Sequence, residues 1–201
     1  MMGTVDLSSI GSGFEHPSIA SQSVFRDALD SLSQPGSVIP ISATVKAPAG
    51  VDAAACALLL ALLDQDTRLW LSPGIAGGGA AGFFRFHTGC VPTFKLEQAD
   101  FALIATPGER PPLDQFLNGS EDFPDRSATL VLQVPLLEAG SGWTLSGPGI
   151  PVTRCLRVGG IDNLFVIEWT HNRRGFPRGV DVFLTCGTRV AGLPRTTRLE
   201  A

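Results

Sequence analysis

The sequence predicts an α/β domain, because segments with helical and with strand periodicity alternate along the chain. Hydrophobic residues make up 44% of the 201 residues, which is enough for a large core and argues against wholesale disorder. The sequence contains no internal repeat and no linker that would divide it. We therefore expect one domain over residues 21–201, preceded by a flexible, Gly/Ser-rich N-terminal arm over residues 1–20.

Two helices are expected in the first third of the chain. Ser23 would cap the first, which runs to about Leu32. Its apolar residues recur at helical spacing: Val24, Phe25, Ala28, Leu29 and Leu32. Asp52 would cap the second, which runs to Leu63 and is apolar nearly all round, so that we expect it to be buried. Strands are predicted over residues 38–43 and 68–71.

The middle of the chain is expected to alternate in the same way. The sequence predicts a short helix that ends near Phe86, a helical turn at residues 113–117 and a helix over residues 162–172. Strands are predicted over residues 101–105, 128–137, 143–146 and 152–156. Pro135 places the far end of the strongest of these strands, residues 128–137, at an edge or a bulge.

Residues 180–193 predict a β-hairpin. One face of its first strand would carry Val180, Val182, Leu184 and Cys186. Gly187 suits the first central position of a type II′ turn. Pro194 would end the returning strand, because proline has no backbone N–H to donate. We expect this hairpin to form the packed edge of the sheet.

Composition restricts the function. A net charge of −4 disfavours nucleic-acid and membrane-surface partners, which require a strong positive field. The longest apolar run, residues 53–63, is too short to span a bilayer, and the first fifteen residues do not resemble a signal peptide. The four cysteines lie far apart, without the local spacing of a zinc or iron–sulfur site. We expect a cytoplasmic protein with free, buried thiols.

A glycine motif is the first candidate site. Gly77, Gly79 and Gly82 match G-x-G-x-x-G after a strand, a pattern that brings a backbone close to a pyrophosphate. Asp100 lies near the expected distance for a ribose-binding acid, but the segment between does not resemble a βαβ unit. An ordinary loop is the favoured interpretation of residues 74–82.

Histidines and cysteines give weaker candidates. His87 lies three residues before Cys90, which would suit a thiolate nucleophile, and His171 follows Glu168 by less than one turn, which would suit a metal or a proton relay. For both histidines the favoured interpretation is a residue near a helix C-terminus, where a cation is favourable. His16 falls in the expected arm, and Cys186 is expected to be a buried, inert thiol.

Arginines give the last candidate. Thirteen arginines contrast with only two lysines, Lys46 and Lys95, which leaves little choice for Schiff-base chemistry. Arg173, Arg174 and Arg178 follow the helix predicted over residues 162–172, and two further arginines, Arg195 and Arg198, close the chain. Arginines grouped in this way would grip a phosphate, a phosphonate or the carboxylates of a partner. The alternative is a solvated face that pairs with nearby acids.

Several blocks together resemble the PhnH family, whose members belong to the bacterial carbon–phosphorus lyase system for phosphonate breakdown. They run in family order and cover most of residues 24–200. The most specific are Asp181 with Leu184-Thr185-Cys186-Gly187, and Pro194-Arg195-Thr196-Thr197. The others are Phe25-Arg26, residues 33–36, residues 58–66, Trp70-Leu71-Ser72, residues 85–88, residues 128–133 and residues 145–150. The expected arm and the glycines at 77–82 lie outside the match.

The resemblance implies a three-layer αβα sandwich with a mixed sheet, similar to pyridoxal-phosphate-dependent transferases but without the cofactor site. It also implies a homodimer in isolation and a core complex with subunits G, I and J, which converts phosphonates by way of a ribosyl triphosphate phosphonate. The resemblance assigns no catalytic residue and no cofactor to this chain. We therefore expect a non-catalytic assembly subunit. The alternatives are a transferase-like enzyme and a phosphonate- or nucleotide-binding module that uses the arginine cluster.

Overall fold

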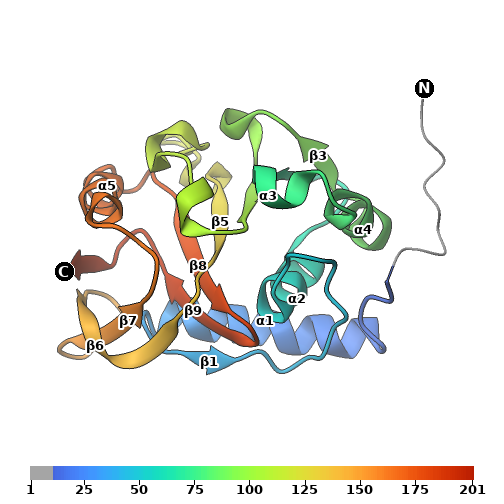
Figure 1. The fold of residues 1–201 in the computed structure, drawn as a ribbon. Helices are drawn as coiled ribbons and strands as arrows, with labels where there is room; N and C mark the ends of the chain where they lie inside the picture. Colours follow the sequence, from blue (N-terminus) through green and yellow to red (C-terminus); the bar gives the residue numbers. More distant parts are fainter. Residues whose placement is uncertain (1–10) are drawn as a thin grey trace.

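A seven-stranded mixed sheet forms the centre of the structure, a computed structural model that describes residues 11–201 (Figure 1). The strands, in spatial order, are β1 (Ile39–Pro40), β9 (Arg189–Leu193), β8 (Asp181–Cys186), β5 (Thr129–Gln133), β4 (Phe101–Ile104), β2 (Arg68–Leu71) and β3 (Val91–Thr93). The five strands from β8 to β3 are parallel; β9 pairs antiparallel with β8, and β1 pairs antiparallel with β9. The prediction of an α/β fold with a mixed sheet is confirmed.

Two apolar layers cover the two faces of this sheet. Successive side chains of β4 and β5 point to opposite faces of the sheet. Leu103 and Val131 therefore join one apolar cluster, while Ile104 and Leu130 join the other. The first cluster lies under α1 (Pro17–Ser33), α2 (Ala53–Leu62), α3 (Pro73–Ala76) and α4 (Ala80–Thr88). The second lies under α5 (Asn163–Arg174) and a small antiparallel sheet of β10 (Arg198–Glu200), β6 (Leu137–Ser146) and β7 (Arg154–Val158).

The layer on the α5 side is therefore partly β-structure, which differs from the helical layer of an αβα sandwich. The small sheet covers the core because its strands contribute buried apolar side chains, Leu145, Leu156 and Leu199 among them. Short 3-10 turns complete the connections: η2 (Leu96–Gln98), η3 (Pro107–Glu109), η4 (Leu113–Gln115) and η5 (Pro124–Arg126).

Helix α1 begins at Pro17 and not near Ser23. Proline suits the first turn of a helix, because the missing N–H would have no partner there. Residues 17–20 of the expected arm are thus helical, and residues 1–10 lie outside the described part of the chain. Of the predicted apolar stripe, Val24 and Ala28 are buried, whereas Phe25 and Leu29 are about half exposed.

The C-terminal hairpin is confirmed in its strands and its turn. Gly187 takes a φ of +62°, and no other residue of the turn has a positive φ, as a type II′ turn requires. The predicted place of the hairpin was wrong, since β8 lies in the middle of the sheet between β5 and β9. The edge next to β9 is formed by β1, which is only two residues long.

Other differences concern the ends of elements. The strand predicted over residues 128–137 ends at Gln133, and Leu137 already begins β6. The strand predicted over residues 38–43 is reduced to β1. Strands β3 and β10 were not predicted. Within residues 11–201, no helix combines the length and the apolar character that crossing a membrane requires.

Candidate functional site

The carboxyl ends of the parallel strands are the first place to look for a site, because open α/β sheets bind ligands in the crevice outside these ends. Gln133, at the end of β5, is 7% exposed and bridges this edge. Its Nε2 donates to the carbonyls of Gly50 (2.9 Å) and Ala105 (3.2 Å), and its Oε1 accepts from the backbone N–H of Asp52. One side chain thus joins β5, the segment after β4 and the start of α2.

Further polar groups of the protein close the same edge. The Ser72 hydroxyl accepts from the Ala105 N–H (2.9 Å), and the Glu109 carboxylate accepts from the Gly74 N–H (2.9 Å). Hydrogen bonds to Ser72 and to the Gly74 backbone lower the pKa of Glu109. These contacts, together with those of Gln133, fill the edge with internal hydrogen bonds.

Asp52 precedes α2, as predicted for its cap, but its side chain binds elsewhere. The carboxylate accepts from the backbone N–H of Gly187 (3.1 Å) in the turn between β8 and β9. Burial raises the pKa of Asp52, and the hydrogen bond from Gly187 partly offsets this rise. Asp52 therefore attaches the C-terminal hairpin to the start of α2.

The glycine-rich segment forms two short helices instead of a phosphate-binding loop. Gly77 ends α3, Gly79 precedes α4, and Gly82 lies within α4. A Cβ placed on any of these three glycines would meet no atom within 4 Å. Close backbone approach to another element, which requires the third glycine of a dinucleotide motif, is absent at these three positions. The geometry favours the interpretation as an ordinary connection.

His87 and Cys90 do not form a couple. The His87 ring packs on Phe83 (4.5 Å between centroids), and its Nε2 lies 3.0 Å from the carbonyl oxygen of Gly11. Cys90 is buried, and burial raises the pKa of its thiol despite a lowering by Thr88 and Arg85. A buried thiol with a raised pKa is a poor nucleophile, and the contacts of His87 with Phe83 and Gly11 are those of a packing residue.

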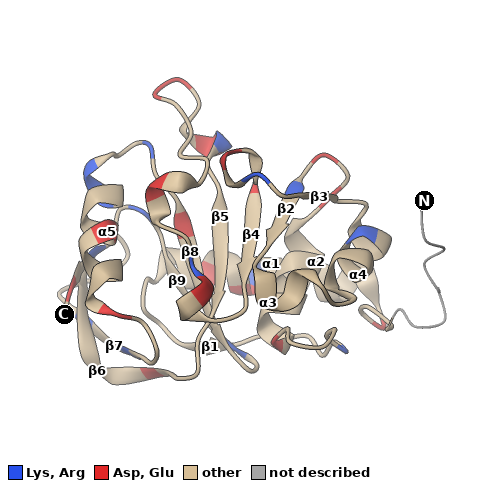
Figure 2. Cartoon of the chain, turned by 45° about the horizontal axis from the view of Figure 1, so that its top comes forward, with Lys and Arg blue, Asp and Glu red and all other residues tan. Residues whose placement is uncertain are grey.

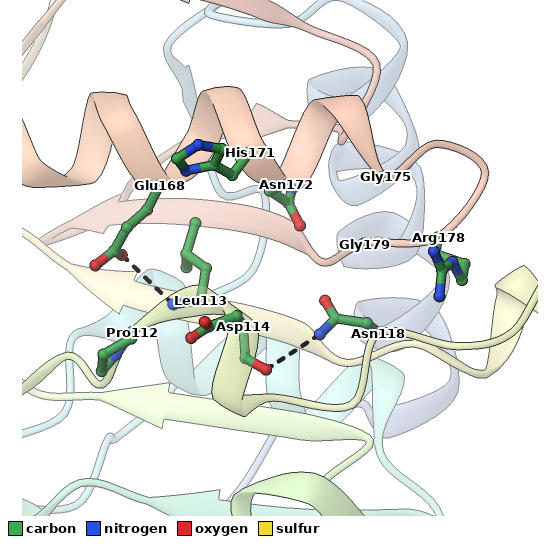
Figure 3. Close-up of a pocket in the computed structure, with 10 residues that line it drawn as sticks. All are labelled: Pro112, Leu113, Asp114, Asn118, Glu168, His171, Asn172, Gly175, Arg178 and Gly179. Carbon is green, nitrogen blue, oxygen red and sulfur yellow. Dashed lines mark hydrogen bonds between the residues drawn. The ribbon is translucent and has the colours of Figure 1, made fainter.

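A pocket of about 310 Å³ lies beside the C-terminal half of α5 (Figure 3). Its walls come from α5, from the η4 segment and from the loop before β8: Pro112, Leu113, Asp114, Asn118, Glu168, His171, Asn172, Gly175, Arg178 and Gly179. The side-chain amide of Asn172 is not free to bind a ligand in this pocket, because it makes two hydrogen bonds with the backbone of Val180.

Glu168 is likewise bound inside the protein. Its carboxylate pairs with Arg110 (2.5 Å), and this guanidinium also lies over the ring of Phe165. His171 is exposed at the pocket rim. Within residues 11–201, no group of three or more His, Cys, Asp and Glu residues is arranged to hold a metal ion. His171 and Glu168 thus share a pocket, but Glu168 already has a partner.

The structure separates the predicted arginine cluster. Arg178 lines the pocket beside η4, whereas Arg173 and Arg174 line a second pocket, of about 270 Å³, between α5 and β10. Arg198 of β10 lines this second pocket too. Figure 2 shows the basic segments at the end of α5 and in the loop after it. Arg198 was grouped with Arg173 and Arg174 in the sequence, but β10, the strand that brings it to them, was not predicted.

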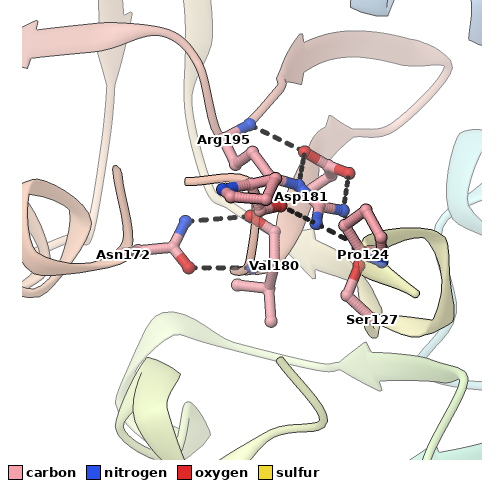
Figure 4. A network of polar contacts seen from close by, with 7 residues as sticks. Pro124, Ser127, Asn172, Val180, Asp181 and Arg195 are labelled. Carbon is pink, nitrogen blue, oxygen red and sulfur yellow. Dashed lines mark hydrogen bonds and ion pairs between the residues drawn. The ribbon is translucent and has the colours of Figure 1, made fainter. Parts of the chain in front are cut away.

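Arg195 belongs to an internal network with Asp181 (Figure 4). Its guanidinium binds the carboxylate of Asp181 through Nε and Nη2, at 3.1 and 2.5 Å, and its backbone N–H donates to the same carboxylate. It also donates to the carbonyls of Pro124 and Pro177 and to the hydroxyl of Ser127. The two blocks that resembled the family most specifically are therefore joined to each other.

Both lysines are exposed and lie outside the two pockets, Lys46 between β1 and α2 and Lys95 just after β3. A lysine that forms a Schiff base is usually made nucleophilic by desolvation. Neither lysine has such surroundings, which weakens the alternative of a transferase-like enzyme.

The cysteines differ in access, which gives a testable prediction. All four are free; Cys56 and Cys90 are buried, Cys186 is partly buried and Cys155 is exposed. The expectation of buried thiols was therefore wrong for Cys155, and Cys186 is less buried than expected. Burial raises the pKa of Cys56 to about 12. At pH 8 we expect a disulfide reagent such as DTNB to modify Cys155 at once, and Cys56 only after unfolding.

A Cys155→Ser variant provides the control. It should lose the rapid phase of the reaction, followed by absorbance, and keep the slow phase that reports unfolding. Rapid modification of the folded variant at Cys56, identified by peptide mass, would contradict the burial of this thiol.

Comparison with known proteins reveals relatives over nearly the whole chain. Residues 12–200 match the family model described as "Bacterial phosphonate metabolism protein (PhnH)". The chain is 39% identical over 187 residues to "Alpha-D-ribose 1-methylphosphonate 5-triphosphate synthase subunit PhnH" of Rhizobium meliloti (strain 1021), covering 93% of this chain and 94% of the relative. It is 32% identical over 180 residues to "Putative C-P lyase subunit protein HtxG" of Stutzerimonas stutzeri, covering 89% and 85%. The chain therefore belongs to the PhnH family of bacterial phosphonate metabolism proteins.

Proposed function

We propose that the chain is a non-catalytic assembly subunit of a bacterial carbon–phosphorus lyase core complex, needed in organic phosphonate catabolism for the formation of ribose 1-alkylphosphonate 5-triphosphate. The observation that carries this proposal is the match along 93% of the chain to a relative named as a subunit of ribose 1-methylphosphonate 5-triphosphate synthase. The second relative is also named as a subunit, of C-P lyase. Because the family match spans residues 12–200, it involves the whole domain and not one motif.

The internal use of polar groups supports a role without catalysis. At the carboxyl ends of the strands, Gln133, Ser72 and Glu109 make hydrogen bonds with the backbone of neighbouring segments. The most buried ion pairs, Arg110 with Glu168 and Arg195 with Asp181, connect elements of the fold to each other. Polar groups that are engaged in this way rigidify the fold, which suits a scaffold.

The finer parts of the proposal concern fold, partners and location. We propose a distant relation of the mixed sheet to pyridoxal-phosphate-dependent transferases without their cofactor site, self-association as a homodimer, and assembly with subunits G, I and J in the cytoplasm. Phe94, the most exposed large apolar side chain of the described residues (94%), is a candidate contact for such association. Sedimentation at micromolar concentration should give twice the chain mass of 21.1 kDa; a monomer would contradict the homodimer.

Affinity purification tests the assembly role. The chain, with a tag at its C-terminus, is expressed in its own host, grown with a phosphonate as the phosphorus source. We expect the other carbon–phosphorus lyase subunits to elute with it in stoichiometric amounts, and an equally tagged unrelated protein of similar size to elute without them. Recovery of the chain without these subunits, under conditions in which they are expressed, would contradict the proposal.

A further inference from the structure

The pocket between α5 and β10 has an unusual charge. Arg173 and Arg174 from α5 and Arg198 from β10 line it, and Glu200 is the one acidic residue of its lining. With Glu200 ionised, this lining carries a net charge of about +2, whereas the whole chain carries −4. A local excess of positive charge on an acidic chain requires an explanation.

Internal ion pairs do not explain it. Among residues 11–201, the arginines that pair with carboxylates are Arg110, Arg157 and Arg195, and none of these lines the pocket. Within the same residues, Arg173 makes one side-chain hydrogen bond, from Nε to the carbonyl of Thr196 (3.3 Å), which leaves its two Nη atoms without a protein partner. The bond fixes the guanidinium while keeping its outer edge available.

Capping of α5 does not explain it either. Arginines near a helix C-terminus often bind its last carbonyls. Here the carbonyls of residues 171–173 accept hydrogen bonds from the backbone N–H groups of Gly175 and Phe176. In the described part of the chain, the side chains of Arg174 and Arg198 form no hydrogen bond to these carbonyls and no ion pair. Both side chains are exposed.

Buried contacts join the two elements that form the pocket. Trp169 is fully buried, and its Nε1–H donates to the carbonyl of Thr197 (2.9 Å). Leu199 is 4% exposed and anchors β10 in the core. The two elements that carry the arginines are thus held in a fixed relation, which lowers the entropic cost of binding a ligand between them.

We propose that this pocket binds a dianionic, tetrahedral phosphorus group, as found in a phosphate ester or a phosphonate. The planar fork of arginine matches such oxygens with paired hydrogen bonds, and a charge of −2 balances that of the lining. The site uses Arg198 together with Arg173 and Arg174, and it does not include Arg178. It goes beyond the assembly role and stands without it, because it depends only on the geometry of this chain.

Calorimetric titration of the full chain tests the site. The probes are inorganic phosphate and methylphosphonate at pH 8.5 and low salt, where both are largely dianionic. The main variant is Arg174→Gln with Arg198→Gln, which removes two exposed side chains. Arg157→Gln is the matched control, because Arg157 is 58% exposed and lies in β7, outside the pocket. Thermal unfolding verifies that each variant is folded.

The unmodified chain should bind at least one probe, and the tighter probe identifies the source as a phosphate ester or a phosphonate. The double variant should bind that probe about a hundredfold more weakly, at about tenfold for each charge-assisted contact. Arg198→Lys, which keeps the charge but loses the fork, should weaken binding less than Arg198→Gln. The proposal is overturned if neither probe binds, if the double variant binds as tightly as the unmodified chain, or if Arg157→Gln weakens binding equally.

Discussion

Replacement of Trp169 by alanine is expected to lower the free energy of unfolding by about 3–5 kcal/mol. Trp169 is fully buried, and its ring stacks on Phe165 with 5.8 Å between centroids. Its loss leaves a cavity under α5 and removes the hydrogen bond to the carbonyl of Thr197. Total stability of a domain is only about 5–15 kcal/mol. Urea unfolding should therefore show a much lower midpoint with an unchanged slope.

Two variants give this prediction its controls. Trp169→Phe keeps an aromatic ring but loses the N–H donor, so its free energy of unfolding should lie between that of the unmodified chain and that of Trp169→Ala. Trp143→Ala removes a tryptophan that also stacks on Phe165 but is only partly buried, and it should cost less, about 1–2 kcal/mol. If Trp169→Ala cost no more than Trp143→Ala, the inferred role of Trp169 in holding α5 to β10 would be wrong.

Replacement of Asp181 by alanine is expected to cost about 3 kcal/mol, since it leaves a largely buried arginine without its counter-charge. The side chains of Asp181 and Arg195 are 22% and 13% exposed, and the carboxylate accepts three hydrogen bonds from Arg195. Arg195 would keep its contacts with the carbonyls of Pro124 and Pro177 but not its charge balance. Chemical unfolding measures the loss.

Glu138→Ala is the matched control for Asp181. Its partner Arg157 lies 3.7 Å away, but both side chains are about half exposed, so this pair should contribute less than about 1 kcal/mol. Equal losses in the two variants would mean that burial does not strengthen the Asp181–Arg195 pair. A double variant, Asp181→Ala with Arg195→Ala, should recover part of the lost stability because no unpaired charge remains.

Local patterns predicted those elements whose signals lie within a short stretch. The alternation from Val180 to Cys186 correctly gave the two faces of β8, and Gly187 correctly gave its turn. Asp162 was placed at the start of α5, where its carboxylate accepts from the N–H of Phe165. Such features depend on neighbouring residues, so the sequence alone contains the information.

Long-range partners were not predictable in this way. The place of β8 depends on β5, some fifty positions earlier, and β10 pairs with β6. Both β3 and β10 have only three residues, too few for a periodic signal. For the same reason, Gln133 was interpreted only as one more strand residue, and the strand that brings Arg198 to Arg173 was not foreseen. Arg195 and Asp181 were marked by resemblance, but only the structure explains their pairing.

We have proposed that this chain contributes to phosphonate conversion by assembly and not by chemistry. The most direct measurement is turnover per assembled complex, using complexes reconstituted with His171→Ala, Lys46→Ala or Lys95→Ala in this chain. These side chains are the exposed candidates for proton transfer or imine formation. We predict unchanged turnover once assembly is normalised by native mass spectrometry. A variant that assembles fully but turns over about a hundredfold more slowly, as loss of an acid–base group would cause, would contradict this account.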